Sequence, residues 1–166
     1  MMKATSKKDL KRILFLQQEA ILPGKTEYDE AMKLARKPDP DLNAVLVLLQ
    51  EASDKNYPDA HYALATWYLF GKVVKRDYET AVAYLHKCSD VVAKASYDLA
   101  VCYEKGKGAS KDKVKAFEYY MRSALLGDGQ AHYEVGRCFY YGIGAGKNKC
   151  LGKLWMDKAG ELGYKE

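Results

Sequence analysis

The sequence predicts an all-α fold, an α-solenoid in which antiparallel helix pairs stack on one another. Three observations support this prediction: an internal repeat of about 35 residues, apolar residues at helical spacing within each copy, and glycine and helix-capping residues at fixed places between the helices. Repeats of this length are typical of helix-pair arrays, because one pair cannot bury its apolar face alone.

Length and composition agree with one folded unit. The chain has 166 residues, of which 48% are hydrophobic and 30% charged, unlike the low-hydrophobicity composition of disordered proteins. The net charge of +5 is too small to indicate a nucleic-acid-binding protein, and it favours a partner with an acidic surface. The 14 tyrosines suit helix packing and wet binding surfaces equally well.

Residues 1–24 are expected to form an N-terminal amphipathic helix or cap. Basic residues precede the apolar run 13–16, as in a secretory signal, but polar residues 17–19 interrupt the run and no small-residue cleavage pattern follows. No other stretch approaches the roughly 20 apolar residues that cross a bilayer. We therefore expect no membrane association and a cytoplasmic location.

The repeat becomes visible when Ala60, Ala95 and Ala131, separated by 35 and 36 residues, are aligned as position 0. Nine positions then carry similar residues in all three copies. They are Tyr62, Tyr97 and Tyr133 at position 2; Leu64, Leu99 and Val135 at 4; Ala65, Ala100 and Gly136 at 5; Tyr68, Tyr103 and Phe139 at 8; Gly71, Gly106 and Gly142 at 11; Asp77, Asp112 and Asn148 at 17; Ala81, Ala116 and Gly152 at 21; Tyr84, Tyr119 and Trp155 at 24; and Lys87, Arg122 and Lys158 at 27.

Each copy, about 57–92, 93–127 and 128–163, therefore predicts two helices. The glycine at position 11 ends the first helix in the left-handed conformation, and Asp or Asn at position 17 caps the second. Small residues at positions 5 and 21 let the two helices approach closely, and the aromatic residues at 8 and 24 fill the space beside them.

Residues 25–56 predict a degenerate first hairpin. Residues 28–35 supply its first helix, residues 37–41 contain two prolines that forbid a continuous helix, and Ala44, Val47 and Gln50 match second-helix positions. The repeat array is thus expected to span 25–166.

A family resemblance is carried by the string Ala131-x-Tyr133-x-Val135-Gly136-x-x-Phe139-x-x-Gly142-x-Gly144, followed by Asn148, Trp155 and Lys158-Ala159. This string resembles the Sel-one-like repeat, a relative of the tetratricopeptide repeat with a longer inter-helix loop. The resemblance implies a right-handed superhelix whose first helices line a concave face. Departures from the family pattern are Val73 for the second loop glycine, Gly152 for the usual alanine, and Cys88-Ser89 for paired alanines.

By analogy with tetratricopeptide geometry, positions 2, 6, 9 and 10 of each first helix face the concave side. The candidate partner-binding residues selected in this way are Tyr62, Thr66, Phe70, Tyr97, Val101, Lys105, Tyr133, Arg137 and Tyr141. Aromatic residues and arginine are enriched in interface hot spots. Two interpretations of the position-2 tyrosines stay open, partner binding or bracing of neighbouring helices, and Arg137 is the stronger candidate because its column holds no other large cation.

A basic loop edge is predicted where the loops between paired helices align. Its residues are Lys72, Lys75, Arg76, Lys107, Lys111, Lys113, Lys147 and Lys149. Such residues are either simply solvated or steer an acidic partner, and steering would make association sensitive to salt. Nucleic acid is disfavoured because lysine predominates and no reading motif accompanies it.

Residues with reactive or metal-binding side chains offer little support for catalysis. Cys102 and Cys138 share position 7 and are expected to be buried small hydrophobic residues. The family resemblance implies that cysteine-rich secreted members pair a cysteine at the end of one second helix with a cysteine that opens the next first helix. Cys88 matches the former position, but Ala95 stands at the latter. No such disulfide is therefore expected, which agrees with a reducing compartment.

The histidines His61, His86 and His132 lie at no zinc-ligand spacing, so neither a metal nor another cofactor is expected. Residues 142–146, Gly-Ile-Gly-Ala-Gly, follow a helix and are a repeat loop, not a dinucleotide-binding motif.

The sequence therefore predicts a non-enzymatic scaffold or adaptor that binds a protein or peptide in its concave groove. A narrower alternative is a bacterial immunity protein that neutralises a co-encoded toxin. A hydrolase, as claimed for some secreted relatives, would need a nucleophile such as Ser123 or Cys88, and no supporting motif is present. Self-association through the last hairpin is a further expectation, because the sequence stops just before position 0 of a next copy.

Overall fold

The computed structural model describes residues 22–164, and within that range it contains eight helices and no strand. The amphipathic helix predicted for residues 1–24 lies outside the described residues except for its last three positions, which form a turn before the first described helix. The helices are α2 (Lys25–Ala35), α3 (Leu42–Asp54), α4 (Pro58–Phe70), α5 (Tyr78–Cys88), α6 (Ala93–Lys105), α7 (Lys113–Leu125), α8 (Gly129–Tyr141) and α9 (Lys149–Glu161).

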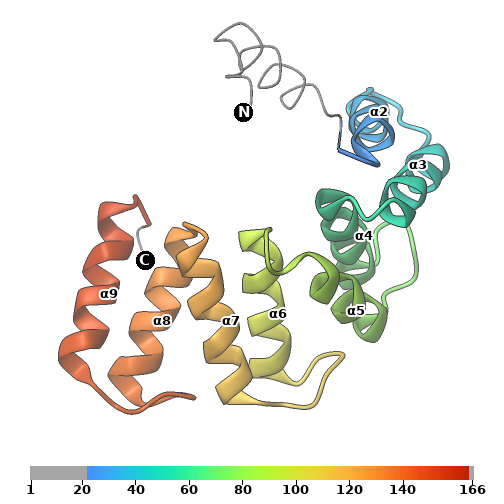
Figure 1. The fold of residues 1–166 in the computed structure, drawn as a ribbon. Coiled ribbons are helices and arrows are strands. Elements are labelled where there is room, and N and C mark those ends of the chain that lie inside the picture. Colours follow the sequence, from blue (N-terminus) through green and yellow to red (C-terminus); the bar gives the residue numbers. More distant parts are fainter. Residues whose placement is uncertain (1–21, 165–166) are drawn as a thin grey trace, which may run out of the picture.

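Successive helices form the pairs α2–α3, α4–α5, α6–α7 and α8–α9, which follow one another along an arc (Figure 1). Each pair also packs against the next, through α3–α4, α5–α6 and α7–α8. The predicted all-α repeat fold is thus confirmed. We call α4, α6 and α8 the first-helix row and α5, α7 and α9 the second-helix row.

The predicted helix ends are where the repeat places them. Gly71, Gly106 and Gly142 close α4, α6 and α8 with φ of 66°, 71° and 76°, a conformation that costs glycine no steric strain. Asp77 and Asp112 each accept hydrogen bonds from two backbone N–H groups at the start of α5 and α7, and Asn148 accepts one at the start of α9, as is typical of helix N-caps of these residue types.

The small residues at positions 5 and 21 are the contact points within each pair. Ala65 and Ala81 are fully buried, and in the last pair glycines replace both alanines. A Cβ added at Gly136 would lie 2.7 Å from the carbonyl oxygen of Gly152, and one added at Gly152 would lie 2.8 Å from the carbonyl oxygen of Gly136. The α8 and α9 backbones therefore touch, which explains why Gly152 departs from the family's alanine.

The second loop glycines tie each loop to the preceding pair. Gly108 and Gly144 have φ of 69° and 68°, and a Cβ at either would collide with the backbone of Tyr78 or Lys113, the first residues of α5 and α7. Val73 holds the equivalent place in the preceding copy and has no positive φ. The loops after α6 and α8 therefore pack directly against the starts of α5 and α7 and help to join successive pairs.

The N-terminal hairpin uses different local signals for the same architecture. Asp41, which follows the two prolines, caps α3 by accepting from the N–H groups of Asn43 and Ala44. The core of the hairpin continues into α4, because Val45, Leu49 and Leu64 are fully buried in one apolar cluster. None of the helices in the described part of the chain is long and apolar enough to span a bilayer.

Candidate functional site

Side chains link the members of the first-helix row directly to one another. The Tyr62 hydroxyl on α4 donates to Asp98 Oδ2 on α6 at 3.2 Å, and Gln130 Nε2 on α8 donates to the Tyr97 hydroxyl on α6 at 2.7 Å. All nine predicted partner-binding residues lie on these three helices. We call the surface that they form the first-helix face.

The position-2 tyrosines are half-buried and contact neighbouring elements. Tyr62 and Tyr97 pack against apolar clusters while their hydroxyls bond to the next first helix, and the Tyr133 ring lies 5.5 Å from that of Tyr164. Burial raises the pKa of both Tyr62 and Tyr97 above the usual value for tyrosine. This geometry braces the row, and contact of the same tyrosines with a partner remains a prediction.

The position-10 residues are the accessible part of the predicted set. Phe70 is 59% exposed and Tyr141 is 64% exposed, although both are large aromatic residues, and Lys105 between them is exposed as well. In contrast, Thr66 at position 6 is half-buried and donates its hydroxyl to the carbonyl of Ala63 at 2.7 Å. The most exposed residues of the predicted set therefore lie at the C-terminal ends of the first helices.

Arg137 is half-buried and forms two ion pairs within the protein. Its guanidinium donates to Glu104 on α6 and to Glu134 on α8, both at 2.6 Å, and the Tyr120 hydroxyl donates to the same Glu104 at 2.9 Å. Burial alone would raise the pKa of Glu104, but the hydrogen bonds from Arg137 and Tyr120 hold it below its ordinary value. The sequence singled out Arg137 but not its two carboxylates, which only the packing of α6 on α8 brings together.

Asp98 is a second residue that the sequence analysis did not select. It is partly buried on α6, and no described residue forms an ion pair with it. Burial raises its pKa to about 6; Asp128 adds to the rise, while the hydrogen bond from Tyr62 and the charge of Lys94 oppose it. The only signal in the sequence is its position 3, which Glu134 occupies in the next copy.

A hollow opens beside Asp98 between α4 and α6. Its apolar wall consists of Leu69, Phe70 and Val101, and its outer rim carries Arg76 and Lys107; Tyr78 and Cys102 complete the lining. Two of the predicted partner-binding residues, Phe70 and Val101, thus line the same hollow as Asp98.

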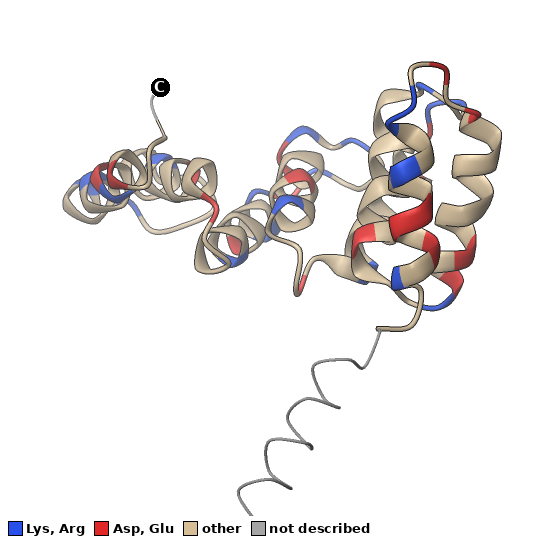
Figure 2. Ribbon diagram, turned by 90° about the horizontal axis from the view of Figure 1, so that it is seen from above, with Lys and Arg blue, Asp and Glu red and all other residues tan. Residues whose placement is uncertain are grey.

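The basic loop edge consists of exposed side chains throughout. Some of them rest on aromatic rings: Lys107 Nζ lies 5.3 Å from the Tyr78 ring centroid and Lys149 Nζ lies 5.5 Å from that of Tyr140. Acidic residues are interspersed among the basic ones along the whole arc (Figure 2). That the basic loop edge steers an acidic partner stays a prediction.

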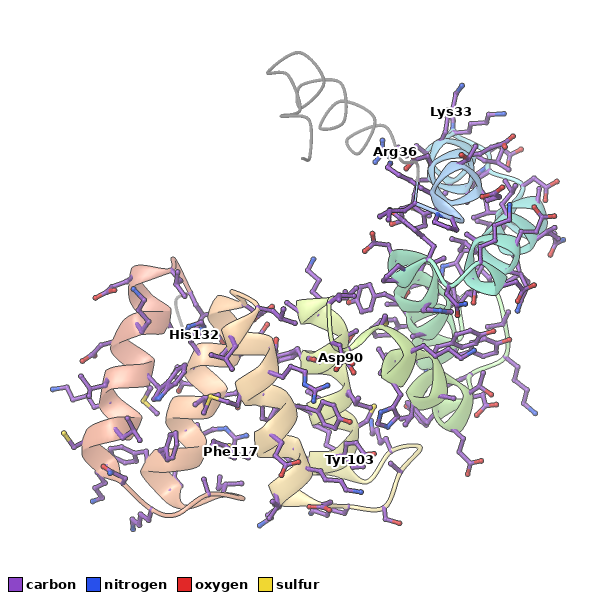
Figure 3. All side chains as sticks on the ribbon, in the orientation of Figure 1. Lys33, Arg36, Asp90, Tyr103, Phe117 and His132 are labelled. Carbon is purple, nitrogen blue, oxygen red and sulfur yellow. The ribbon has the colours of Figure 1, made fainter. Side chains whose placement is uncertain are left out.

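An aromatic cluster, which the sequence predicted only as packing, joins α5, α6 and α7 through His86, Tyr103 and Tyr119. The Tyr103 and Tyr119 rings stack with centroids 5.6 Å apart, and the two ring nitrogens of His86 bond to their hydroxyls at 3.0 and 3.2 Å. Nearby, Arg122 pairs with Asp90, which lies in the turn that leads into α6 (Figure 3). Every polar atom of His86 is therefore already used within the protein.

Three of the four cysteines, and Ser123, are buried in the core, whereas Cys150 is exposed. Cys102 and Cys138 are 3% and 1% exposed, which confirms that they are small core residues, and burial raises the pKa of each thiol to about 11. Cys88 is equally buried, with a pKa raised to about 12, and the fully buried Ser123 donates its hydroxyl to the carbonyl of Ala93 at 2.8 Å. Neither Ser123 nor Cys88, the two candidate nucleophiles for a hydrolase, is accessible.

Two of the histidines have packing roles. His61 is buried and shares a 2.9 Å hydrogen bond with Ser53, and His132 donates Nδ1 to the carbonyl of Asp128 and packs on Trp155. Among the described residues, no three histidine, cysteine or acidic side chains lie close enough together to hold a metal ion.

Comparison with protein families matches the Sel1 repeat at residues 58–90, 93–128 and 129–164, which together make up more than half of the chain. The chain belongs to the Sel1 repeat family. Its sequence is 29% identical over 129 residues to Protein SHC1 of Saccharomyces cerevisiae and 30% identical over 102 residues to DAP3-binding cell death enhancer 1 of Mus musculus. These matches cover 71% and 61% of the chain but only 24% and 20% of the relatives' own lengths.

Solved structures show the same solenoid. A Sel1 repeat protein from Oxalobacter formigenes matches with a TM-score of 0.67 and 30% identity, covering 72% of the chain and 91% of that protein. The protective antigen c5321 of uropathogenic Escherichia coli matches with a TM-score of 0.81 and 22% identity, covering 92% and 33%. The immunity protein Pa5087 of Pseudomonas aeruginosa matches with a TM-score of 0.59 and 24% identity, covering 85% and 54%.

Proposed function

We propose that the chain is a scaffold that binds a protein or peptide partner on the first-helix face. Sel1 repeat proteins are generally protein-interaction scaffolds, and a relative is named for binding another protein, DAP3. The observation that carries the proposal is the exposure of Phe70 and Tyr141 at equivalent places on α4 and α8, with Lys105 between them. Large aromatic side chains exposed in one column are typical of binding surfaces, since they bury much area at little entropic cost.

Affinity capture with the tagged chain tests this proposal. The double variant Phe70→Ser, Tyr141→Ser removes two exposed side chains without touching the core, and we expect it to lose the partner that the unmodified chain retains. The matched control is Val114→Ser, Leu125→Ser on α7, where both side chains are also exposed. Retention of every partner by the first variant, with an unchanged circular dichroism spectrum, would contradict the proposal.

An immunity protein against a co-encoded toxin is a narrower version of the same function. It is favoured by the structural likeness to Pa5087, which at 24% identity concerns the fold. Co-expression with the product of a neighbouring gene tests it: the chain should restore growth, and the Phe70→Ser, Tyr141→Ser variant should not. A hydrolase is not proposed, because Ser123 and Cys88 are buried and hydrogen-bonded to backbone carbonyls.

The basic loop edge gives the proposal an electrostatic component. If an acidic partner approaches along these loops, exposed lysines raise the rate of association, and salt screens this attraction at separations beyond about 8 Å at physiological ionic strength. The triple variant Lys107→Gln, Lys111→Gln, Lys147→Gln should lower the association rate and flatten its dependence on salt. An unchanged salt dependence would show that these loop lysines are only solvated.

A further inference from the structure

The two junctions of the first-helix row place different residues at equivalent positions. At the α6–α8 junction, Arg137 at position 6 lies between Glu104 at position 9 and Glu134 at position 3. At the α4–α6 junction, the residue at position 6 is Val101, and Asp98 holds position 3. The second junction therefore keeps an acidic residue, and within residues 22–164 no cation forms an ion pair with it.

The missing cation leaves Asp98 with incomplete solvation. The Tyr62 hydroxyl donates to Oδ2 at 3.2 Å, and none of the described residues forms an ion pair with this carboxylate. The charged groups around it are Lys94 on its own helix, Asp128 before α8, and Arg76 and Lys107 on the rim of the hollow. A partly buried carboxylate gains free energy from any donor that replaces the water it has lost.

Space is available where the α6–α8 junction has its arginine. The hollow beside Asp98 is lined by Leu69, Phe70 and Val101, whose apolar surfaces suit the methylene stem of a long basic side chain. Phe70 is 59% exposed, so its ring is accessible to a planar cation. The lining of the hollow thus supplies a carboxylate for a guanidinium and apolar surface for the stem of an arginine side chain.

We propose that the hollow between α4 and α6 is a receptor for an arginine side chain of the partner, with Asp98 binding the guanidinium and Phe70, Leu69 and Val101 contacting its stem. This inference rests on the proposed function and names the chemistry of the partner. Arginine fits better than lysine, since a guanidinium binds a carboxylate with two parallel hydrogen bonds and stacks on an aromatic ring.

The rim of the hollow adds a second requirement. Arg76 and Lys107 both lie over the Tyr78 ring, with cation-to-centroid distances of 6.0 and 5.3 Å. They disfavour an isolated cation and favour an acidic residue of the partner beside its arginine. The partner segment therefore carries an arginine with an aspartate or glutamate next to it. A segment that is rich in arginine but has no acidic residue would not match Arg76 and Lys107.

The guanidinium binds the ionised form of Asp98, so binding is coupled to protonation. Burial raises the pKa of Asp98 to about 6, so the free protein protonates this carboxyl as pH falls below that value and the site loses its charge. Affinity for arginine should therefore weaken between pH 7 and pH 5. In return, a bound guanidinium should lower the pKa of Asp98.

A titration with short peptides tests the site directly. The probe is the capped tetrapeptide acetyl-Gly-Arg-Asp-Gly-amide, and the control probe carries neutral citrulline in place of arginine. In amide NMR spectra of the full chain, the arginine probe should shift the signals of Phe70, Asp98 and Val101, and citrulline should bind at least about tenfold more weakly, the usual loss for a hydrogen bond to a charged group. Equal binding of the two probes overturns the proposal.

Two variants check the location. Asp98→Asn removes the charge, and Val101→Arg places in this junction the arginine that Arg137 supplies in the next one; both should abolish the shifts. Val47→Arg, at a valine 56% exposed on α3, is the matched control and should bind the probe normally. Should Val101→Arg fail to fold, as judged by circular dichroism, the Asp98→Asn titration decides alone, and normal binding by Asp98→Asn overturns the site.

The same variants separate this inference from the proposed function. If the captured partner survives Val101→Arg and Asp98→Asn but is lost with Phe70→Ser, Tyr141→Ser, the first-helix face binds a partner and the arginine receptor is wrong. If the probe binds at Asp98 while no captured partner depends on the first-helix face, the receptor stands and the proposed function falls.

Discussion

The α4–α6 and α6–α8 junctions join copies of one repeat, yet one is closed by charges and the other is open. In the closed junction Arg137 bridges Glu104 and Glu134, and in the open one Val101 faces a hollow beside Asp98. Both junctions keep the buried alanines and leucines that hold the helices together. A repeat thus conserves its fold through the apolar and small positions and is free to change positions 3, 6 and 9, where a binding site can form without cost to the core.

The largest effect should come from breaking the closed junction. Arg137→Glu would bring three carboxylates together in a half-buried place, and we expect the free energy of unfolding to fall by about 3 kcal/mol, as when one partner of a buried ion pair is lost. Urea unfolding measures this loss. Lys158→Glu, in an exposed ion pair with Glu161, is the control and should cost less than about 1 kcal/mol.

Close packing of the last pair gives the next effect. Gly136→Ala should lower the free energy of unfolding by about 2 kcal/mol, since the new Cβ would overlap the Gly152 carbonyl oxygen and Met156, and overpacking costs of this order. Gly160→Ala is the control: a Cβ there meets nothing within 4 Å, and a helical Gly→Ala change is neutral or stabilising. A destabilisation of equal size in both variants would refute the backbone-contact explanation.

The open junction should make stability depend on pH. Because burial raises the folded-state pKa of Asp98 to about 6, the folded protein keeps this carboxyl protonated in a pH range where the unfolded chain has already lost the proton. The contribution of Asp98 to stability is therefore largest below its pKa in the unfolded chain and falls as pH rises through 6. We expect Asp98→Asn to be more stable than the unmodified chain at pH 7 by about 1 kcal/mol after allowance for solvent screening, and to lose this advantage at pH 4. Thermal unfolding at both pH values checks this; parallel curves would contradict it.

The smallest effect should come from closing the open junction. Val101→Arg supplies Asp98 with an internal partner, so its pKa should fall and the pH dependence of stability should flatten, with a gain at pH 7 of about 0.5 kcal/mol, in the range of partly exposed ion pairs. In the Asp98→Asn background, Val101→Arg should give no such gain. An additive result in that double-mutant cycle would show that residues 98 and 101 do not interact.

The sequence by itself determined the helix pairs, their ends and the family. Helix ends depend on local backbone conformation, so Gly71 and Asp77 could be interpreted from residue type and spacing alone. The same logic explains why Cys102 was correctly predicted to be buried: it shares an apolar position with Trp67 and Cys138. Periodic, local signals of this kind survive without knowledge of the tertiary structure.

Only the tertiary structure decided which charges meet. Glu104 is 33 residues from Arg137, and Asp98 is 36 from Tyr62, so each contact depends on how one repeat packs on the next. From sequence, Arg137 was the strongest candidate for partner binding, whereas the packing pairs it with two carboxylates and, in the part of the chain that the structure describes, gives Asp98 no ion pair. The energies of ion pairs depend on distance and burial, and a repeat alignment contains neither quantity. The hollow beside Asp98 could therefore be identified only from the tertiary structure.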